Sequence, residues 1–409
     1  MRISTNQIYD QNIRAIMENQ KQLTNTNEQM TTGKRINRPS DDPIGAASVV
    51  RLTEQLDKIT QYHRNNDLLT SALEQQETVL GNINDSLDRA RTLAIQAGNS
   101  AMSDDDRSAI GNELEQIRNE VLDLMNSQDA NGNYIYAGYQ SQQQAFTFNP
   151  AAVGNAITFT GDSGTTSVRL SDSVTVQRSS SGMEVFENVL ARNNFTVSAV
   201  SAPATLSSSK VTELGNFDQF FSANYDPVNP ANNDYQLEVI AGNQVQLTNV
   251  GTGAIVDTVD FTSGEPFTVQ GMTFKLNGAL GNTVDFSLDP PEKKNIAETI
   301  HDLATLLLNG GLSNDALESA VADALVGLDN GKEALSFERS SLGGRMNIAE
   351  SIYATNYDLE ISTKATKSSI EDVDYAEASI EFSKQEAALS AALATFPQVT
   401  GLTLFDYIR

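Results

Sequence analysis

Several residue types are missing or scarce in this chain of 409 residues, and each absence excludes certain functions of the protein. Cysteine is absent, which excludes disulfide bonds, thiolate chemistry and cysteine-bound zinc. Tryptophan is also absent and aromatic residues make up only 7%, so any single globular core is small for this length. The two histidines, His63 and His301, are far apart in sequence. We therefore expect no catalytic site, no cofactor and no bound metal.

Membrane and nucleic-acid signals are missing as well. No apolar run approaches the ~20 residues that a membrane span needs. The first six residues lack the apolar core of a cleavable secretion signal, so export would require another route. The net charge of −26 would repel a phosphate backbone. We expect no membrane partner and no nucleic-acid partner.

Long heptad repeats occupy both ends of the chain and are missing from its middle. Alternating steps of four and three residues place each series on one face of an α-helix. The three series are Tyr9, Ile13, Ile16, Gln20, Leu23, Asn27, Met30; Tyr62, Asn66, Leu69, Leu73, Gln76, Leu80, Ile83, Leu87, Ala90, Ala94, Ala97; and Ile352, Asn356, Leu359, Thr363, Thr366, Ile370, Val373. Helices from opposite ends of the chain can bury these faces against each other only by lying side by side. The pattern predicts an α+β protein: a long α-helical coiled-coil rod formed by both chain ends, with an inserted β-rich domain.

Helix breakers set the expected ends of the first two helices. The first is predicted over about residues 7–31, with Gly33 as a left-handed C-cap. Asp42 before Pro43 favours the start of a second helix, whose pattern continues to Ala97. About 55 helical residues span roughly 80 Å, far more than a typical globular helix.

More helices are predicted on both sides of the middle region. Ser103 and the acidic residues after it favour a helix that pairs antiparallel with the preceding one. After Asp289-Pro290-Pro291 we expect helices at 296–307, 316–337 and 342–396, with Pro397 ending the last.

The middle of the chain has the alternating apolar pattern of strands. Short alternating pairs separated by turn residues predict one β-rich domain over about 145–290. Ala241-Gly242-Asn243 is typical of a hairpin turn. Residues 201–232, which are rich in Ser, Ala, Pro and Asn, are expected to be mostly loop.

Two short motifs imitate chemical sites without completing them. Asp129, Asn131 and Asn133 have the spacing that opens a calcium loop, but the later glycine and glutamate of such a loop are missing. A turn explains these residues better. Ser207 and Lys210 have the spacing of a nucleophile pair, without its companion motifs.

Polar residues within the heptad series have two interpretations. Asn and Gln at these positions indicate either an exposed helix or a coiled coil whose register they fix at a cost in stability. Helices of the second kind are marginal alone and become stable when neighbours pack on them. We favour the second interpretation because the end of the chain, residues 401–409, is also apolar and needs covering.

Three segments resemble the bacterial flagellin family. They are Met1-Arg2-Ile3-Ser4-Thr5, Thr32-Gly33-Lys34-Arg35-Ile36-Asn37-Arg38-Pro39-Ser40-Asp41-Asp42-Pro43, and Ser369-Ile370-Glu371-Asp372-Val373-Asp374-Tyr375-Ala376. Within the family, three features resemble the branch that joins hook and filament more than filament flagellin. These are the Arg-Pro-Ser-Asp-Asp-Pro segment, Asn131-Gly132-Asn133-Tyr134-Ile135-Tyr136-Ala137-Gly138 and Leu404-Phe405-Asp406-Tyr407. The resemblance covers about 1–146 and 335–409.

The resemblance implies a structural protein of the bacterial flagellum, not an enzyme. It implies export, unfolded, by the flagellar secretion apparatus, with an export chaperone in the cytoplasm. The implied partners at the hook–filament junction are further copies of the chain in a ring or helical stack, the first hook-associated protein and flagellin. The implied regions are 1–42 and 375–409 in an inner coiled-coil layer, 43–144 and 291–374 in a helical rod, and 145–290 as a β-rich domain facing solvent.

The expected assembly interface combines the two terminal helices. We expect Ile13, Ile16, Leu23 and Met30 to pair with Leu389, Leu393 and Phe396, and Leu402, Leu404 and Phe405 to bury against neighbouring subunits. Each large apolar side chain that is fully buried contributes about 1.5–3 kcal/mol, so a handful repeated around a ring suffices for a stable joint.

Three other functions remain open at this point. A filament flagellin subunit would share the fold and the export route. A coiled-coil surface adhesin would need a signal peptide or an anchor. An enzyme would need a catalytic cluster in the middle domain, and residues 145–290 contain no histidine.

Overall fold

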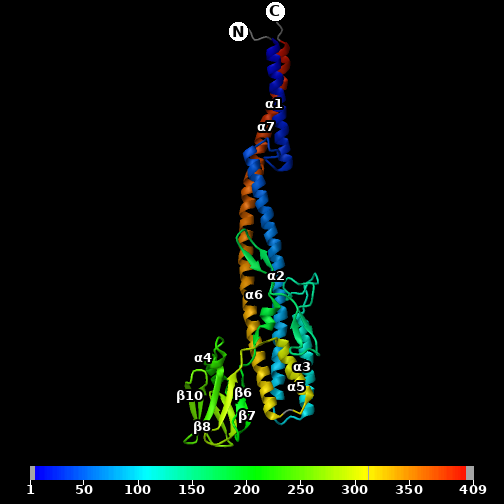
Figure 1. The fold of residues 1–409 in the computed structure, drawn as a ribbon. Coiled ribbons are helices and arrows are strands. Elements are labelled where there is room, and N and C mark those ends of the chain that lie inside the picture. Colours follow the sequence, from blue (N-terminus) through cyan, green and yellow to red (C-terminus); the bar gives the residue numbers. More distant parts are fainter. Residues whose placement is uncertain (1–4, 312, 402–409) are drawn as a thin grey trace, which may run out of the picture. The chain divides into compact units, whose positions relative to one another are not determined.

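The computed structural model describes residues 5–311 and 313–401. Along the sequence, long helices precede and follow a central region rich in strands, so the predicted α+β class is confirmed (Figure 1). The helices are α1 (Thr5–Thr32), α2 (Pro43–Ala97), α3 (Asp104–Met125), α4 (Leu214–Asn224), α5 (Ile296–Asn309), α6 (Asn314–Glu371) and α7 (Tyr375–Gly401). A π-helical turn at Met183–Glu187 and a 3-10 turn at Pro230–Asn233 are also present.

The strands are short and fall between α3 and α5. They are β1 (Phe146–Phe148), β2 (Ile157–Phe159), β3 (Ser167–Arg169), β4 (Thr175–Gln177), β5 (Val189–Leu190), β6 (Phe195–Val200), β7 (Thr205–Val211), β8 (Asp234–Ile240), β9 (Gln244–Asn249), β10 (Ile255–Asp260), β11 (Pro266–Val269), β12 (Met272–Asn277), β13 (Thr283–Leu288) and β14 (Lys293–Lys294).

The chain divides into two compact units. The terminal unit comprises Met1–Leu68, Arg169–Thr175 and Ala349–Arg409. The central unit comprises Leu69–Val168 and Val176–Ile348. The five predicted domain boundaries remain predictions.

The first three helices agree closely with the sequence pattern. α1 extends the predicted range by two residues at its start and one at its end, and Gly33 adopts the left-handed conformation with φ 73°. α2 has the predicted bounds, and its heptad residues from Leu69 to Ala97 are buried. At the start of α3, the Ser103 hydroxyl accepts a hydrogen bond from the Asp106 amide, and the Asp106 carboxylate accepts one from the Ser103 amide.

The last two helices correct the prediction. α6 is one helix, without the predicted break between 337 and 342, because Leu335 and Leu342 are fully buried on either side of that point. The chain breaks instead at Asp374, whose carboxylate accepts the Ala376 amide at the start of α7. α7 also continues past Pro397, since a proline removes one helical hydrogen bond but keeps a helical φ.

In the terminal unit, a short segment between strands lies on α2 and α6. Asn65 donates to the Arg169 carbonyl (2.8 Å), and Asn356 donates to the Leu170 carbonyl (2.9 Å). Tyr62 donates to the Asp172 carboxylate (2.7 Å), which raises the pKa of its hydroxyl. Residues 169–175 are therefore fixed to both helices.

In the central unit, charged pairs join α2 and α6 and packing joins α3 and α5. Arg339 of α6 donates to Glu77 of α2 (2.7 Å), and Arg91 of α2 donates to Asp329 of α6 (2.7 Å). The buried face of α3 comprises Ile110, Gly111, Leu114, Ile117, Arg118, Val121 and Met125. α5 packs against α3 with Ile296, Ile300, Leu303 and Leu307 buried, as its apolar spacing predicts.

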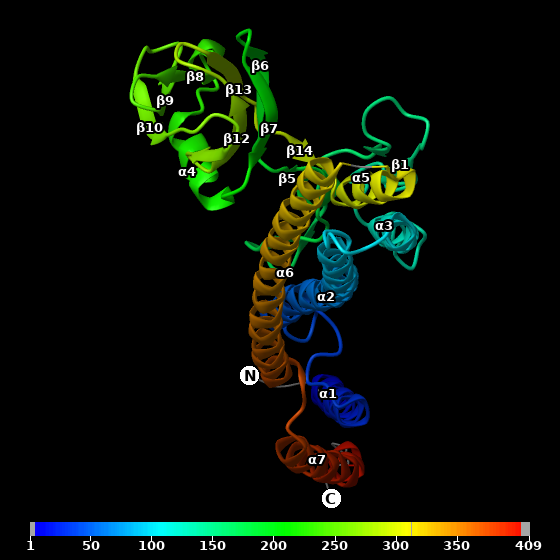
Figure 2. The ribbon, with the colours of Figure 1, turned by 90° about the horizontal axis from the view of Figure 1, so that it is seen from below.

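The larger part of the strand region is a sandwich with its own core. A five-stranded antiparallel sheet in the order β10-β9-β8-β13-β6 lies with a three-stranded sheet, β11-β12-β7, and with α4 (Figure 2). Gly242 and Asn243, both with positive φ, form the predicted β8–β9 hairpin turn. The core cluster runs from Phe195 to Leu288.

The structure corrects one expectation about this region and adds one detail. Residues 201–232 are not mostly loop: they include β7 and α4, because Phe217, Phe220 and Phe221 give an otherwise polar segment one apolar face. Strands β1–β4 form two separate two-stranded sheets, outside the sandwich core.

One buried carboxylate holds the β1–β2 hairpin to α5. Glu298 is 2% exposed, and its two carboxylate oxygens accept the amides of Ala156 (2.9 Å) and Ile157 (2.8 Å). Beside it, Arg118 lies over the Phe148 ring (4.2 Å). A two-stranded hairpin is marginal alone, so this anchor positions it.

We predict that Glu298→Gln loosens the hairpin, because an amide NH2 group does not accept a hydrogen bond and one strand N–H loses its partner. Losing a hydrogen bond to a charged group costs about 1–3 kcal/mol, so amide exchange at Ala156 and Ile157 should accelerate about 5- to 150-fold. Hydrogen exchange followed by mass spectrometry measures this. The matched control is Glu333→Gln at an exposed position of α6. Equal protection in both variants would contradict the assignment.

Candidate assembly site

The candidate site is the pair formed by α1 and α7, which lie side by side in both views (Figures 1 and 2). Of the predicted interface residues, Ile13, Ile16, Leu23, Met30, Leu389 and Phe396 are half-buried. Leu393 is 53% exposed and does not join them. Leu402, Leu404 and Phe405 lie outside the described residues.

The helical phase explains why Leu393 was misplaced. The less exposed side chains of α7 follow steps of four and three through Ala378, Phe382, Gln385, Leu389, Ala392 and Phe396. Ala392 therefore occupies the position predicted for Leu393. In α1 the corresponding positions include Asn19 and Thr26, while the predicted Gln20 and Asn27 are exposed.

A polar contact lies at the centre of the α1–α7 pair. The buried Thr26 hydroxyl lies 3.0 Å from the Gln385 side-chain oxygen and 3.1 Å from the Gln22 carbonyl oxygen. Nearer the end of the pair, the rings of Tyr9 and Phe396 are 5.4 Å apart. The pair thus combines one buried hydrogen bond with large apolar side chains that are only half-buried.

Backbone hydrogen bonds join the loop between α1 and α2 to the segment between α6 and α7. The Arg35 amide donates to the Glu371 carbonyl (2.7 Å), and the Val373 amide donates to the Gly33 carbonyl (3.0 Å). Lys34 and Asp372 form an antiparallel bridge between these bonds. We call the loop 33–42 and residues 370–374 the crossover.

Side chains reinforce the crossover. The Lys34 ammonium lies 2.5 Å from a carboxylate oxygen of Glu371, a hydrogen bond that raises the pKa of Lys34. The Arg35 guanidinium donates to the Ile370 carbonyl (2.8 Å). Two of the segments that carry the family resemblance therefore bind each other, although more than 300 residues separate them in sequence.

Within the loop, two aspartates organise the start of α2. Asp41 accepts the Arg38 amide (2.9 Å), and Asp42 accepts the Gly45 amide (2.9 Å) as a helix cap. A Cβ atom at Gly45 would lie 2.4 Å from the Asp42 carboxylate and 2.6 Å from the Ile36 side chain. Only glycine fits at position 45 while this cap is in place.

Apolar side chains are exposed on several helices of the terminal unit. Tyr353, Tyr357 and Ile361 follow one another at steps of four on α6 and therefore share a face. Among the described residues of the unit, the other exposed large apolar side chains are Tyr9, Met17, Ile44, Val50, Leu68, Leu359, Tyr375, Ile380 and Leu393. Large exposed apolar surface is typical of interaction sites.

The histidines lie at helix contacts. Nε2 of His63 is 3.2 Å from a Glu360 carboxylate oxygen, and its ring packs edge-on against Tyr353. Nδ1 of His301 is 2.7 Å from Arg118. Within the described residues there is no group of three or more histidine or acidic side chains that could hold a metal ion.

The residues that imitate a calcium loop form a turn. The Asp129 carboxylate accepts the amides of Asn131 and Asn133, both at 2.9 Å. Burial raises the pKa of Asp129, but these hydrogen bonds outweigh it and the net shift is downward. Among the described helices, none is both long and apolar enough to span a bilayer.

Sequence comparison relates the first third of the chain to flagellar proteins. Residues 3–141 match the family model of the bacterial flagellin N-terminal helical region. Over 146 residues the chain is 38% identical to flagellar hook-associated protein 3 of Salmonella typhimurium. The aligned region covers 36% of this chain and 46% of that protein. The protein of the same name from Escherichia coli is 36% identical over 147 residues. The match thus spans about half the length of these curated relatives.

Solved structures show the same fold over a longer range. Flagellar hook-associated protein 3 from Legionella pneumophila has a TM-score of 0.59 at 23% identity and covers 78% of this chain and 97% of its own. FlgL from Xanthomonas campestris has a TM-score of 0.57 at 21% identity, covering 78% and 99%. The resemblance to the flagellin family is therefore confirmed by sequence at the N-terminal end, and the fold likeness extends well beyond it.

We predict that Gly45→Ala destabilises the crossover, because the new methyl group displaces Asp42 from its capping position. Losing a cap costs about 0.5–2 kcal/mol, and amides of residues 36–45 should exchange correspondingly faster. Gly81→Ala in the same helix is the matched control, since nothing lies within 4 Å of a Cβ there. Helix propensity makes that change stabilising by about 0.5–1 kcal/mol. The crossover assignment is wrong if the two variants behave alike.

Proposed function

We propose that this chain is a structural protein of the bacterial flagellum that joins the hook, through the first hook-associated protein, to the flagellin filament. Support comes from the identity of 36–38% with two hook-associated proteins 3. The observation that carries the mechanism is the weakly packed α1–α7 pair with apolar side chains exposed around it. In this proposal the chain has no enzymatic role.

Self-assembly would follow from the composition of the terminal pair. α1 and α7 have 28 and 27 residues, and most of the stability of a helix in a protein comes from packing of its apolar face. The large apolar side chains between α1 and α7 are only half-buried, so the pair has little of this stability on its own. Neighbouring copies that cover the exposed side chains would add about 1.5–3 kcal/mol for each large residue fully buried. Repetition around a ring or helical stack multiplies that gain.

The proposed interface keeps the predicted residues but divides their roles. Ile13, Ile16, Leu23, Met30, Leu389 and Phe396 would hold α1 and α7 together. Leu393, which is directed away from α1, would contact a neighbouring subunit, as would Leu402, Leu404 and Phe405. Export by the flagellar secretion apparatus with a cytoplasmic chaperone, and contact with flagellin, belong to the same proposal.

The second candidate function is a filament flagellin subunit. A flagellin of Clostridium tyrobutyricum is 22% identical over 403 residues and covers 98% of this chain and all of that protein. The higher identity with hook-associated proteins favours the junction. The two functions differ in what happens to exported flagellin when this chain is missing.

Deletion of the gene, followed by electron microscopy and assay of flagellin in the medium, distinguishes the two functions. We expect hooks without filaments and flagellin shed into the medium, because exported subunits would have no base on which to assemble. Filament loss without shed flagellin would indicate the filament subunit. Unchanged filaments would contradict both functions.

We predict that Leu393→Asp leaves the chain folded and exported but blocks filament growth when it replaces the natural protein in the deletion strain. A carboxylate buried in a subunit contact is strongly unfavourable. The matched control is Val228→Asp, on a loop of the sandwich, where the valine is 80% exposed. Circular dichroism of the purified variants and their amounts in the medium show whether folding and export are intact. Normal filaments on Leu393→Asp would contradict the proposed role of this residue.

A further inference from the structure

The sandwich is connected to the helices of the central unit by few strong contacts. Its own core lies between Phe195 and Leu288, so its strands do not depend on the helices for burial. The chain enters through β5 and leaves through β14, and these two-residue strands pair with each other as Val189 with Lys294 and Leu190 with Lys293. A short two-stranded ribbon of this kind is a flexible connection.

Arg192, just after β5, connects this ribbon to both sides. Its side chain is 5% exposed, and one guanidinium nitrogen pairs with Asp323 of α6 (3.0 Å) while another donates to the Val211 carbonyl at the end of β7 (2.9 Å). A buried guanidinium with two partners holds helix and sheet at a fixed separation.

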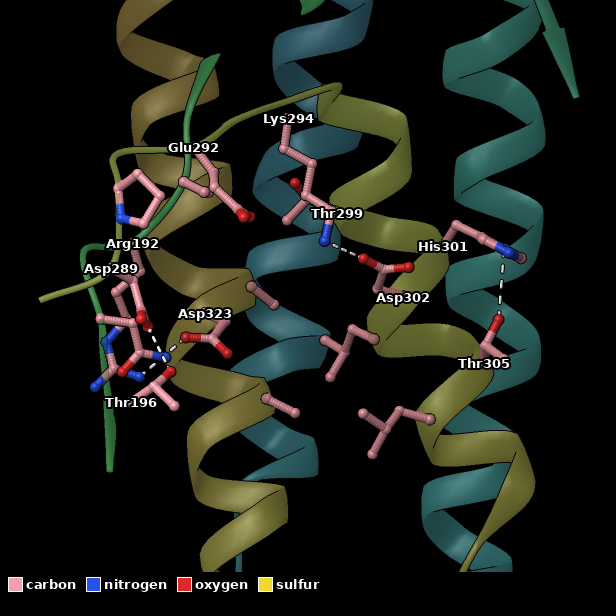
Figure 3. A pocket seen from close by; sticks show the side chains of 18 of the residues that line it. Arg192, Thr196, Asp289, Glu292, Lys294, Thr299, His301, Asp302, Thr305 and Asp323 are labelled. Carbon is pink, nitrogen blue, oxygen red and sulfur yellow. Dashed lines mark hydrogen bonds and ion pairs between the residues drawn. The ribbon is translucent and has the colours of Figure 1, made fainter. Parts of the chain in front are cut away.

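Two clefts flank Arg192, so the contact around it is not closely packed. One cleft, of about 800 Å³, lies beside α5 and α6, and Figure 3 shows its charged side chains. Thr196 donates to Asp289 there, and Lys294 pairs with Asp302. The other cleft, of about 320 Å³, is also lined by Arg192, together with residues of β7 and α6.

The pairing inside the larger cleft argues against a ligand site. Arg192 pairs with Asp323, Lys294 pairs with Asp302 and Asp289 accepts a hydrogen bond from Thr196, as the dashed lines in Figure 3 show. Of these contacts, only the pair of Arg192 with Asp323 joins the edge of the sandwich to α6. The two clefts therefore leave the contact between the sandwich and α6 incompletely packed.

A second cation completes the connection. Lys210 of β7 pairs with Asp315 (3.2 Å) and Glu318 (2.7 Å), which lie near the start of α6. These carboxylates are more than half exposed, and exposed ion pairs are weak and screened by salt. We call Arg192 and Lys210 with their three carboxylates the clasp.

We propose that the sandwich is hinged at the β5–β14 ribbon and that the clasp holds it against α6 as a latch whose Lys210 pairs are weakened by salt. With the clasp closed the sandwich has one position; with it open the sandwich moves while its own core stays folded. The partner of the clasp cations is the acidic first half of α6, and no other molecule is required. This inference does not depend on the proposed function.

Single-molecule fluorescence transfer in the full-length chain tests the hinge. The chain has no cysteine, so Asp105→Cys on α3 and Leu280→Cys on the sandwich, both exposed, accept a dye pair without further changes. At about 0.1 M salt we expect one narrow distribution of distances, and at about 1 M salt a several-fold larger fraction of molecules outside it. Lys210→Glu should cause the same broadening at low salt.

Two further variants isolate the clasp from net charge. Lys210→Glu combined with Glu318→Lys restores opposite charges and should restore the narrow distribution. Lys58→Glu makes the same charge change at an exposed position of α2 in the terminal unit, which contributes nothing to the clasp, and should leave the distribution narrow.

Three results would overturn the hinge. The first is a distribution that neither salt nor Lys210→Glu alters. The second is equal broadening by Lys58→Glu, which would assign the effect to net charge. The third is loss of the near-ultraviolet circular dichroism of the sandwich in Lys210→Glu, because the hinge requires its core to remain folded.

Discussion

Buried amide side chains that donate to backbone carbonyls are the interaction on which the long helices depend. Asn66 of α2 donates to the Ala349 carbonyl of α6, and Asn356 of α6 donates to the Leu170 carbonyl. Further along α2, Gln76 donates to the Arg178 carbonyl (2.7 Å). Each amide meets one particular peptide group, so sliding a helix by one turn would leave buried polar groups unpaired. A continuous apolar face would impose no such register.

The crossover extends this principle to the ends of the chain. α1 and α7 are each joined to a long helix by a short connection, and neither connection is rigid alone. Bonding the two connections to each other, through Arg35 with Glu371 and Gly33 with Val373, fixes both at once. This is a physical reason for the detailed sequence of both segments: Gly33 needs a positive φ, and Asp42 requires a glycine at position 45.

Sequence predicted what depends on local rules and missed what depends on distant partners. The two ends of α2 follow from Pro43 and from a strong apolar repeat, and both ends were predicted correctly. Where the repeat consists of alanine, threonine and amides, several helical phases fit equally well, and Thr26 and Ala392 were missed in favour of their neighbours Asn27 and Leu393. No local sequence pattern predicts the contact of residues 169–175 with α2 and α6. The side-chain amides of the helices bind backbone carbonyls there, and every residue type has a backbone carbonyl.

The phase of α7 has a consequence for how the terminal pair could assemble. If Leu393 faced α1 in place of Ala392, the pair would bury one more large aliphatic side chain and be more stable alone. The observed phase buries Ala392 instead and exposes Leu393. The central contact, between Thr26 and Gln385, is a hydrogen bond with a net contribution of about 0.5–1.5 kcal/mol. Part of the apolar burial is therefore left for contacts outside the pair, which is the distribution expected of helices that gain stability when other copies surround them.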